Sequence, residues 1–66
     1  MHITLNGQPR EVTENMTLAG LLEEAGLAQG GYAVAVNMAV VPRSRIAAYL
    51  LKEGDQIEAI EAVGGG

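Results

Sequence analysis

The chain opens with a short stretch in which apolar and polar residues alternate. Residues 1–5 read Met-His-Ile-Thr-Leu, which is the two-residue period of a strand with one buried face. Asn6-Gly7 follows, and both residue types tolerate the positive φ angles of a type I′ turn. The pattern predicts a hairpin whose second strand runs from residue 8 to about residue 12. Pro9 places that second strand at a sheet edge, because proline cannot donate to a hydrogen-bond ladder.

The next segment has the period of an amphipathic helix. Thr17 is a suitable N-cap. After it, apolar residues recur at i, i+3, i+4 and i+7, namely Leu18, Leu21, Leu22 and Ala25. Gly26 suits the C′ position that ends a helix. The pattern therefore predicts one helix with a single buried stripe.

Strand-like segments fill the second half of the chain. Tyr32–Val36 has apolar residues on both faces, so we expect Val34 and Val36 in the core and the small Ala33 and Ala35 on the opposite face.

A turn at residues 37–38 leads to a short strand at residues 40–41, which Pro42 ends. Residues 43–49 leave room for an irregular or single-turn helical connection, and residues 53–55 form a turn. The last strand is expected over residues 56–63.

The predicted order is β-β-α-β-β-β, which is typical of an α+β fold. We expect a β-grasp (ubiquitin-like) arrangement, with a mixed sheet of about five strands and one main helix packed on one face. In that fold the first and last strands are central and parallel; the strand order comes from the fold analogy. Residues 1–63 are expected to form the domain, and residues 64–66 a flexible C-terminal glycine tail.

Composition narrows the chemistry. The 66 residues contain no cysteine, which excludes disulfides and thiolate chemistry. The net charge of −4 argues against nucleic acid as a partner and suits a basic patch on a protein partner. No apolar run approaches the roughly 20 residues that cross a bilayer, and no secretory signal is visible. We therefore expect a cytoplasmic protein with no membrane association.

A catalytic or metal site is not expected. His2 is the only histidine and Ser44 the only serine, so no nucleophile, base and orienting group can be assembled. A metal site from His2 and Glu58 across the sheet is conceivable, but one histidine at a strand start is more typical of a surface residue.

The end of the chain carries the stronger signal. If Ile57 and Ala59 face the helix, Ile60 and Ala62 lie on the uncovered face beside the two alanines of the third strand, Ala33 and Ala35. A contiguous apolar patch of this kind often marks a partner site. It leads to Gly64-Gly65-Gly66, a thin segment that could enter a narrow pocket; the alternative is a frayed end or the stub of a linker.

These motifs together resemble the ThiS family of thiamine-biosynthesis sulfur carriers. The resemblance covers essentially the whole chain and rests on Asn6-Gly7, Thr17-Leu18, Leu21-Leu22, Val36-Asn37, Val41-Pro42-Arg43, Gly54-Asp55-Gln56-Ile57-Glu58 and Gly65-Gly66.

The resemblance implies a carrier whose C-terminal carboxylate is the working group. An adenylating (ubiquitin-activating-like) enzyme would use ATP to convert the carboxylate of Gly66 into an acyl-adenylate. A sulfur-relay donor would turn the adenylate into a thiocarboxylate, and thiazole synthase would take the sulfur. Gly65, and with less support from the family pattern Gly64, would thread the partners' active sites. The carrier would bind no cofactor and no metal itself.

Alternatives remain open at this point. The small, MoaD-like subunit of molybdopterin synthase has the same fold and ending, and a carrier could serve another sulfur metabolite. A ubiquitin-like modifier or plain interaction module belongs to a different class, and a small enzyme built on His2 to a third.

Overall fold

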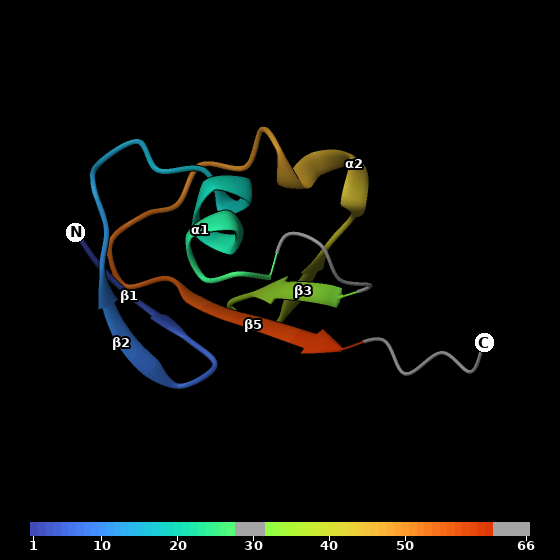
Figure 1. Cartoon of the computed structure of the whole chain (residues 1–66), viewed down its shortest axis with the longest axis horizontal. Helices are drawn as coiled ribbons and strands as arrows, with labels where there is room; N and C mark the ends of the chain where they lie inside the picture. The colour runs from blue at the N-terminus through green and yellow to red at the C-terminus, as the bar shows by residue number, and fades with distance from the viewer. Residues whose placement is uncertain (28–31, 62–66) are drawn as a thin grey trace.

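A computed structural model of the chain describes residues 1–27 and 32–61 (Figure 1). These residues form one five-stranded mixed sheet in the order β2-β1-β5-β3-β4. The elements are β1 (His2–Leu5), β2 (Gln8–Glu11), α1 (Leu18–Glu24), β3 (Tyr32–Val36), β4 (Ala39–Val41), α2 (Arg43–Ile46) and β5 (Gln56–Glu61). Both helices lie on the same side of the sheet, above it in Figure 1.

The sheet has the arrangement of a β-grasp fold, as the sequence predicts. β1 and β5 run parallel in its interior, with Thr4 opposite Gln56 and Leu5 opposite Ile57. β2 pairs antiparallel with β1, and β3 pairs antiparallel with both β5 and β4. The short α2 is the single-turn connection expected within residues 43–49. The last strand is described to Glu61, and residues 62–63 of the predicted strand lie outside the described residues.

The first hairpin closes through the predicted turn. Asn6 and Gly7 have φ angles of 52° and 81°, the left-handed values that a type I′ turn requires at both central positions. Pro9 lies in β2, which is an edge strand of the sheet. The edge position tolerates proline because no further strand needs its missing N–H.

Helix α1 begins at the predicted cap. The Oγ1 atom of Thr17 accepts a hydrogen bond of 3.1 Å from the backbone N–H of Gly20, which satisfies one of the free donors of the first turn. A Cβ at Gly20 would lie 3.1 Å from Met16 Sδ and 3.2 Å from that same Oγ1. Glycine therefore relieves crowding at the helix start. At the other end Gly26 has a φ angle of 76°, as expected of a C′ residue.

The core is a single aliphatic layer between the helices and the sheet. Leu18 and Leu21 of α1 are fully buried, and they belong to one cluster with the inward side chains of the interior strands. Its buried members among the described residues are Ile3, Leu5, Val12, Leu18, Leu21, Leu22, Val34, Val36, Val41, Leu51 and Ile57. Because aromatic rings are absent from this cluster, its cohesion comes from close packing of branched side chains.

Neither helix resembles a membrane span. In the part of the chain that the structure describes, no helix is both long enough and apolar enough to cross a bilayer.

Candidate functional site

The last described strand, β5, is held along its whole length. At its far end Glu61 pairs with Tyr32 of β3. On its other side β1 stops at Leu5, and Asn6 continues the pairing: its backbone N–H donates to the carbonyl of Ile57 over 2.8 Å. The side-chain oxygen of Asn6 then accepts from the N–H of Ala59 over 2.9 Å. The turn residue thus also extends the ladder of the strand from which the glycine segment leaves.

Hydrogen bonds between the β3–β4 turn and the loop before β5 fix the start of β5. The carboxylate of Asp55, only 6% exposed, accepts hydrogen bonds from the side-chain N–H of Asn37 (3.0 Å) and the backbone N–H of Lys52 (2.8 Å). Asn37 also accepts from the backbone N–H of Gln56 over 3.0 Å. A buried carboxylate is tolerated only when donors of this kind replace water. Asn37 and Asp55, two residues on which the family resemblance rests, therefore position β5.

Asparagine at position 37 also suits the backbone conformation of the β3–β4 turn. Asn37 and Met38 form the turn between β3 and β4 with φ angles of 52° and 71°. Asparagine adopts this left-handed conformation more readily than most side chains do. One residue thus closes the β3–β4 hairpin and bonds to the neighbouring loop.

No element of the described residues covers the sheet face opposite the helices, and Ile60 lies on that face. Ile60 is 62% exposed and pairs directly with Ala33, which is also exposed. Ala35, one step along β3 on the same face, is half-buried. Figure 1 shows both helices on the other side of the sheet and no described element beneath it. The described members of the predicted docking face therefore lie together.

The sequence analysis missed two members of this face. Val40 of β4 pairs with Ala35 and is 73% exposed, and Glu58 pairs with Ala35 from the other side. The sequence could have predicted the position of Val40. If Val41 of the same short strand is buried, Val40 must point to the opposite face, because successive side chains alternate along a strand. We call Ala33, Ala35, Val40 and Ile60 the open face. Glu58 adds one carboxylate to it.

The other predicted site residues follow Glu61 in the sequence. Ala62, which was assigned to the docking face, and the glycines Gly64, Gly65 and Gly66 lie outside the described residues.

His2 does not meet Glu58. Its Nδ1 atom lies 3.7 Å from Oε2 of Glu53, whose carboxylate also accepts from the His2 backbone N–H. Within residues 1–27 and 32–61, no three histidine, cysteine, aspartate or glutamate side chains come together as a metal site would require. The conceivable pairing of His2 with Glu58 is thus replaced by a surface contact.

Comparison with known proteins decides the family. The sequence matches the ThiS family over residues 3–66. The chain belongs to the ThiS family. Sulfur carrier protein ThiS of Escherichia coli (strain K12) is 35% identical over 66 residues, which is the full length of both chains.

Two further relatives are longer proteins. A thiazole synthase of Magnetococcus marinus is 46% identical to this chain over 66 residues, and one of Paramagnetospirillum magneticum is 35% identical. All of this chain is covered in both comparisons, but only 20% of each thiazole synthase. A ThiS-like segment therefore occurs within the same polypeptide as a thiazole synthase.

Solved structures of another ThiS protein share the fold. The crystal structure of the thiamine biosynthesis protein ThiS from Geobacter metallireducens superposes with a TM-score of 0.86 at 33% identity, and each chain is covered completely. Its solution structure gives a TM-score of 0.75 at 35% identity over all of this chain and 88% of the other. The β-grasp architecture is thus that of the ThiS family.

Proposed function

We propose that this ThiS-family protein is a sulfur carrier of thiamine biosynthesis and that the α-carboxylate of Gly66 carries the sulfur. Membership of the family is the observation that supports the proposal most directly. In this role the protein is a co-substrate of its partner enzymes, and its own side chains perform no catalytic step.

The proposed chemistry has three steps. A carboxylate is a poor acyl donor until one of its oxygens becomes part of a leaving group. The adenylating enzyme would supply this activation: the Gly66 carboxylate attacks the α-phosphorus of ATP, which forms the acyl-adenylate and releases pyrophosphate. The terminal sulfur of a persulfide on the relay donor then displaces AMP and gives an acyl disulfide between the carrier and the donor. A thiol attacks the donor's sulfur in that bond, which releases the thiocarboxylate and leaves the thiol in a disulfide with the donor. ATP is used on the partner, so the carrier needs no cofactor.

The acceptor is proposed to be thiazole synthase. Two thiazole synthases contain a segment similar to this whole chain, and tethering of two proteins in one polypeptide raises their effective concentration for each other. A carrier that shuttles between an adenylating enzyme and a synthase would meet both in the compartment that supplies ATP, and we propose the cytoplasm.

The geometry of β5 suits delivery of a terminal group. The strand is described to Glu61, and five residues separate it from the end of Gly66. Fully extended, five residues span about 17 Å. The open face would dock on the partner while the glycines, which have no side chains, enter its active site.

Intact mass spectrometry tests the proposal. Carrier incubated with its adenylating enzyme, ATP and a sulfur donor should gain the mass difference between sulfur and oxygen, and lose it again when thiazole synthase and its substrates are added. Conjugates to lysine side chains in place of this shift would support a ubiquitin-like modifier. Sulfur transfer to a molybdopterin precursor, with none to thiazole, would support the MoaD-like alternative.

Ile60→Asp should separate docking from folding. The substitution places a charge in the centre of the open face, so we expect binding to the adenylating enzyme to weaken about tenfold or more. Because Ile60 is largely exposed, the free energy of unfolding should fall by no more than about 1 kcal/mol. Calorimetric titration and urea denaturation measure the two quantities.

Thr13→Asp is the matched control for Ile60→Asp. Thr13 is exposed in the loop between β2 and α1, a segment that rises to the helix side of the sheet in Figure 1, and its substitution changes the net charge equally. It should leave binding unchanged. Equal weakening by both variants, or unfolding by Ile60→Asp, would contradict the docking role of the open face.

A further inference from the structure

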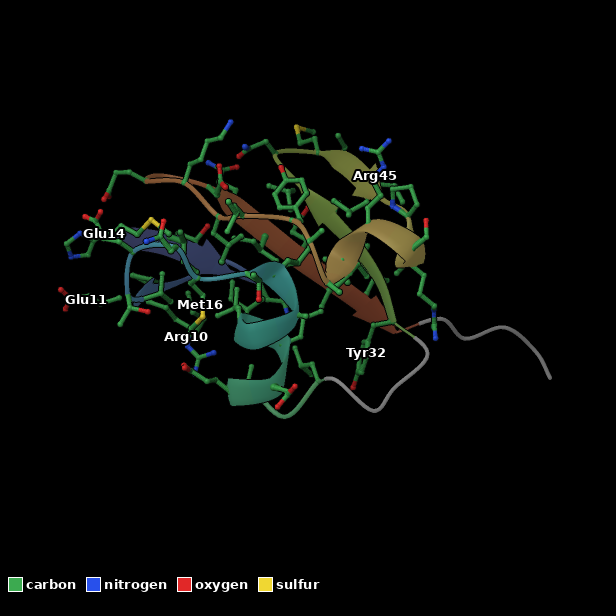
Figure 2. The ribbon with its side chains drawn as sticks, turned by 90° about the horizontal axis from the view of Figure 1, so that it is seen from above. Arg10, Glu11, Glu14, Met16, Tyr32 and Arg45 are labelled. Atoms are coloured by element: carbon green, nitrogen blue, oxygen red, sulfur yellow. The ribbon has the colours of Figure 1, made fainter. Side chains whose placement is uncertain are left out.

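The charges of this chain are segregated along the sequence. All eight acidic residues fall within residues 11–24 and 53–61, whereas residues 25–52 contain none. The same central stretch holds three of the four cations, Arg43, Arg45 and Lys52. Figure 2 shows Glu11 and Glu14 at one end of the molecule and Arg45 toward the other. The net charge of −4 therefore conceals a locally basic side.

The fold gathers part of this stretch into one surface around α2. Two shallow grooves meet there and share Arg45 and Tyr49 as lining residues; Val40 lines the first groove, and Leu50 and Lys52 line the second. We call Val40, Arg45, Tyr49, Leu50 and Lys52 the β4–α2 surface.

This surface has no negative charge of its own. No acidic side chain lines either of its two grooves, whereas the grooves along α1 include Glu23 or Glu24. Among the described side chains, the one ion pair joins His2 to Glu53. Neither Arg45 nor Lys52 takes part in that pair. Lys52 does lie beside carboxylates, because Glu53 follows it and its backbone N–H donates to Asp55, so Arg45 is the cation of this surface that a partner's carboxylate would meet.

The β4–α2 surface also exposes large apolar side chains. Val40 is 73% exposed and Leu50 53% exposed. An exposed leucine next to a half-buried tyrosine and two cations combines an apolar contact with a charged rim, which is the composition of a protein-binding patch. Val40 also belongs to the open face, so the β4–α2 surface continues the proposed docking region around the β4 edge of the sheet.

The backbone beneath this surface is fixed before any partner binds. The N–H of Leu18 donates to the carbonyl of Tyr49 over 2.8 Å, and the N–H of Leu51 donates to the carbonyl of Met16 over 2.9 Å. Leu50 lies between these two bonds and bridges to Thr17. Side chains on a preorganised backbone lose less entropy on binding, so this surface is suited to recognition.

We propose that the β4–α2 surface docks a partner protein that presents carboxylates around an apolar contact. It would be a second recognition element beside the open face, and it rests on the proposed function for the identity of the partners. Charge complementarity at a rim raises the association rate and selects the partner.

Two features favour a protein over a polyanion. Nucleic acid and anionic lipid present extended negative charge, which would also face the acidic residues of this chain, and a net charge of −4 opposes binding to either. A partner protein can confine a few carboxylates to the area opposite Arg45, within the Debye length of about 8 Å at physiological salt. The two cations of the surface, Arg45 and Lys52, would also contribute only about 1 kcal/mol each at an anionic lipid surface.

Arg45→Glu tests the proposal, with Arg10→Glu as the matched control. Both substitutions take the net charge from −4 to the same new value, but Arg10 lies in β2, the edge strand opposite β4, and apart from Arg45 in Figure 2. The probes are the purified adenylating enzyme and thiazole synthase. We expect Arg45→Glu to weaken binding to at least one of them about tenfold or more, mainly through a slower association rate that loses its dependence on salt. Arg10→Glu should change the affinity less than twofold.

Several outcomes would overturn the inference. Equal weakening by both variants would indicate an effect of net charge alone, and unchanged affinity of Arg45→Glu for both enzymes would exclude the surface from docking. Sedimentation with phosphatidylserine vesicles that Arg45→Glu abolishes, with both enzymes unaffected, would make this surface a lipid site. A failure of the proposed function is separate: it would appear as a wild-type protein that never gains sulfur.

Discussion

A chain that lacks Gly65 and Gly66 is expected to lose sulfur loading completely while it keeps the stability of the full chain. Removal of both residues leaves Gly64 as the terminal residue, two positions short of the adenylating site, and shortens the arm by about 7 Å. An acyl group displaced by that distance cannot react, because misplacement by even about 1 Å can cost a factor of 100. Intact mass after incubation with the adenylating enzyme, ATP and a sulfur donor measures the loss.

Stability should not change, because the described core does not extend to the glycines. The buried apolar cluster ends at Ile57, and β5 is paired with β3 up to Glu61. Urea denaturation of the shortened chain should therefore overlay that of the full chain. Retained sulfur loading would remove the terminal carboxylate from the proposed chemistry, whereas a lowered unfolding midpoint would assign the glycines to the fold.

Deletion of one glycine is the informative control. Removing Gly64, Gly65 or Gly66 gives the same polypeptide, because three identical residues follow Val63. That chain still ends in two glycines and is shorter by about 3.5 Å. It therefore tests the length of the arm and not the identity of one residue. If only a diglycine end is needed, as the family pattern implies, loading should persist at a reduced rate; if the third glycine sets the reach, loading should fail here too.

The second large effect is on folding: Leu21→Ala should unfold a considerable fraction of the protein. Leu21 has no exposed surface and packs in the single core cluster, and a buried leucine replaced by alanine costs about 2–5 kcal/mol. A 66-residue domain has a total stability of about 3–10 kcal/mol. The substitution should lower Tm by about 4–8 °C for each kcal/mol lost, which calorimetry or circular dichroism measures.

Leu50→Ala provides the same chemical change at an exposed position. Leu50 is about half exposed, and surface substitutions usually alter stability by no more than about 0.5 kcal/mol. Its Tm should stay within a few degrees of the wild type. Similar losses for Leu21→Ala and Leu50→Ala would mean that the core does not lie between α1 and the sheet.

Residues that carry the family resemblance and residues of the two proposed docking surfaces have different structural roles. Asn6, Asn37 and Asp55 bond to β5 or to the loop before it. Their role is to hold the strand that leads to the glycines. The open face and the β4–α2 surface present side chains to solvent, and we expect partner proteins to contact these residues.

The local pattern of the chain was sufficient to predict most of the fold. The period of two in residues 1–5 and the helical spacing of Leu18, Leu21 and Leu22 each report which side of an element is buried, because that information lies within a few residues. The first turn could also be predicted from neighbouring residues alone. Asn6 and Gly7 both tolerate the positive φ angles of a type I′ turn, and the structure has positive φ angles at both residues.

What the sequence alone determined is therefore the set of elements and the side of each element that is buried. The tertiary structure decided which side chains from distant elements meet. Asp55 binding Asn37, Asn6 binding the N–H of Ala59, and Val40 lying across β3 from β5 all depend on strand order and loop packing. Periodicity carries no record of such pairings, because each strand satisfies its own pattern whichever neighbour lies beside it.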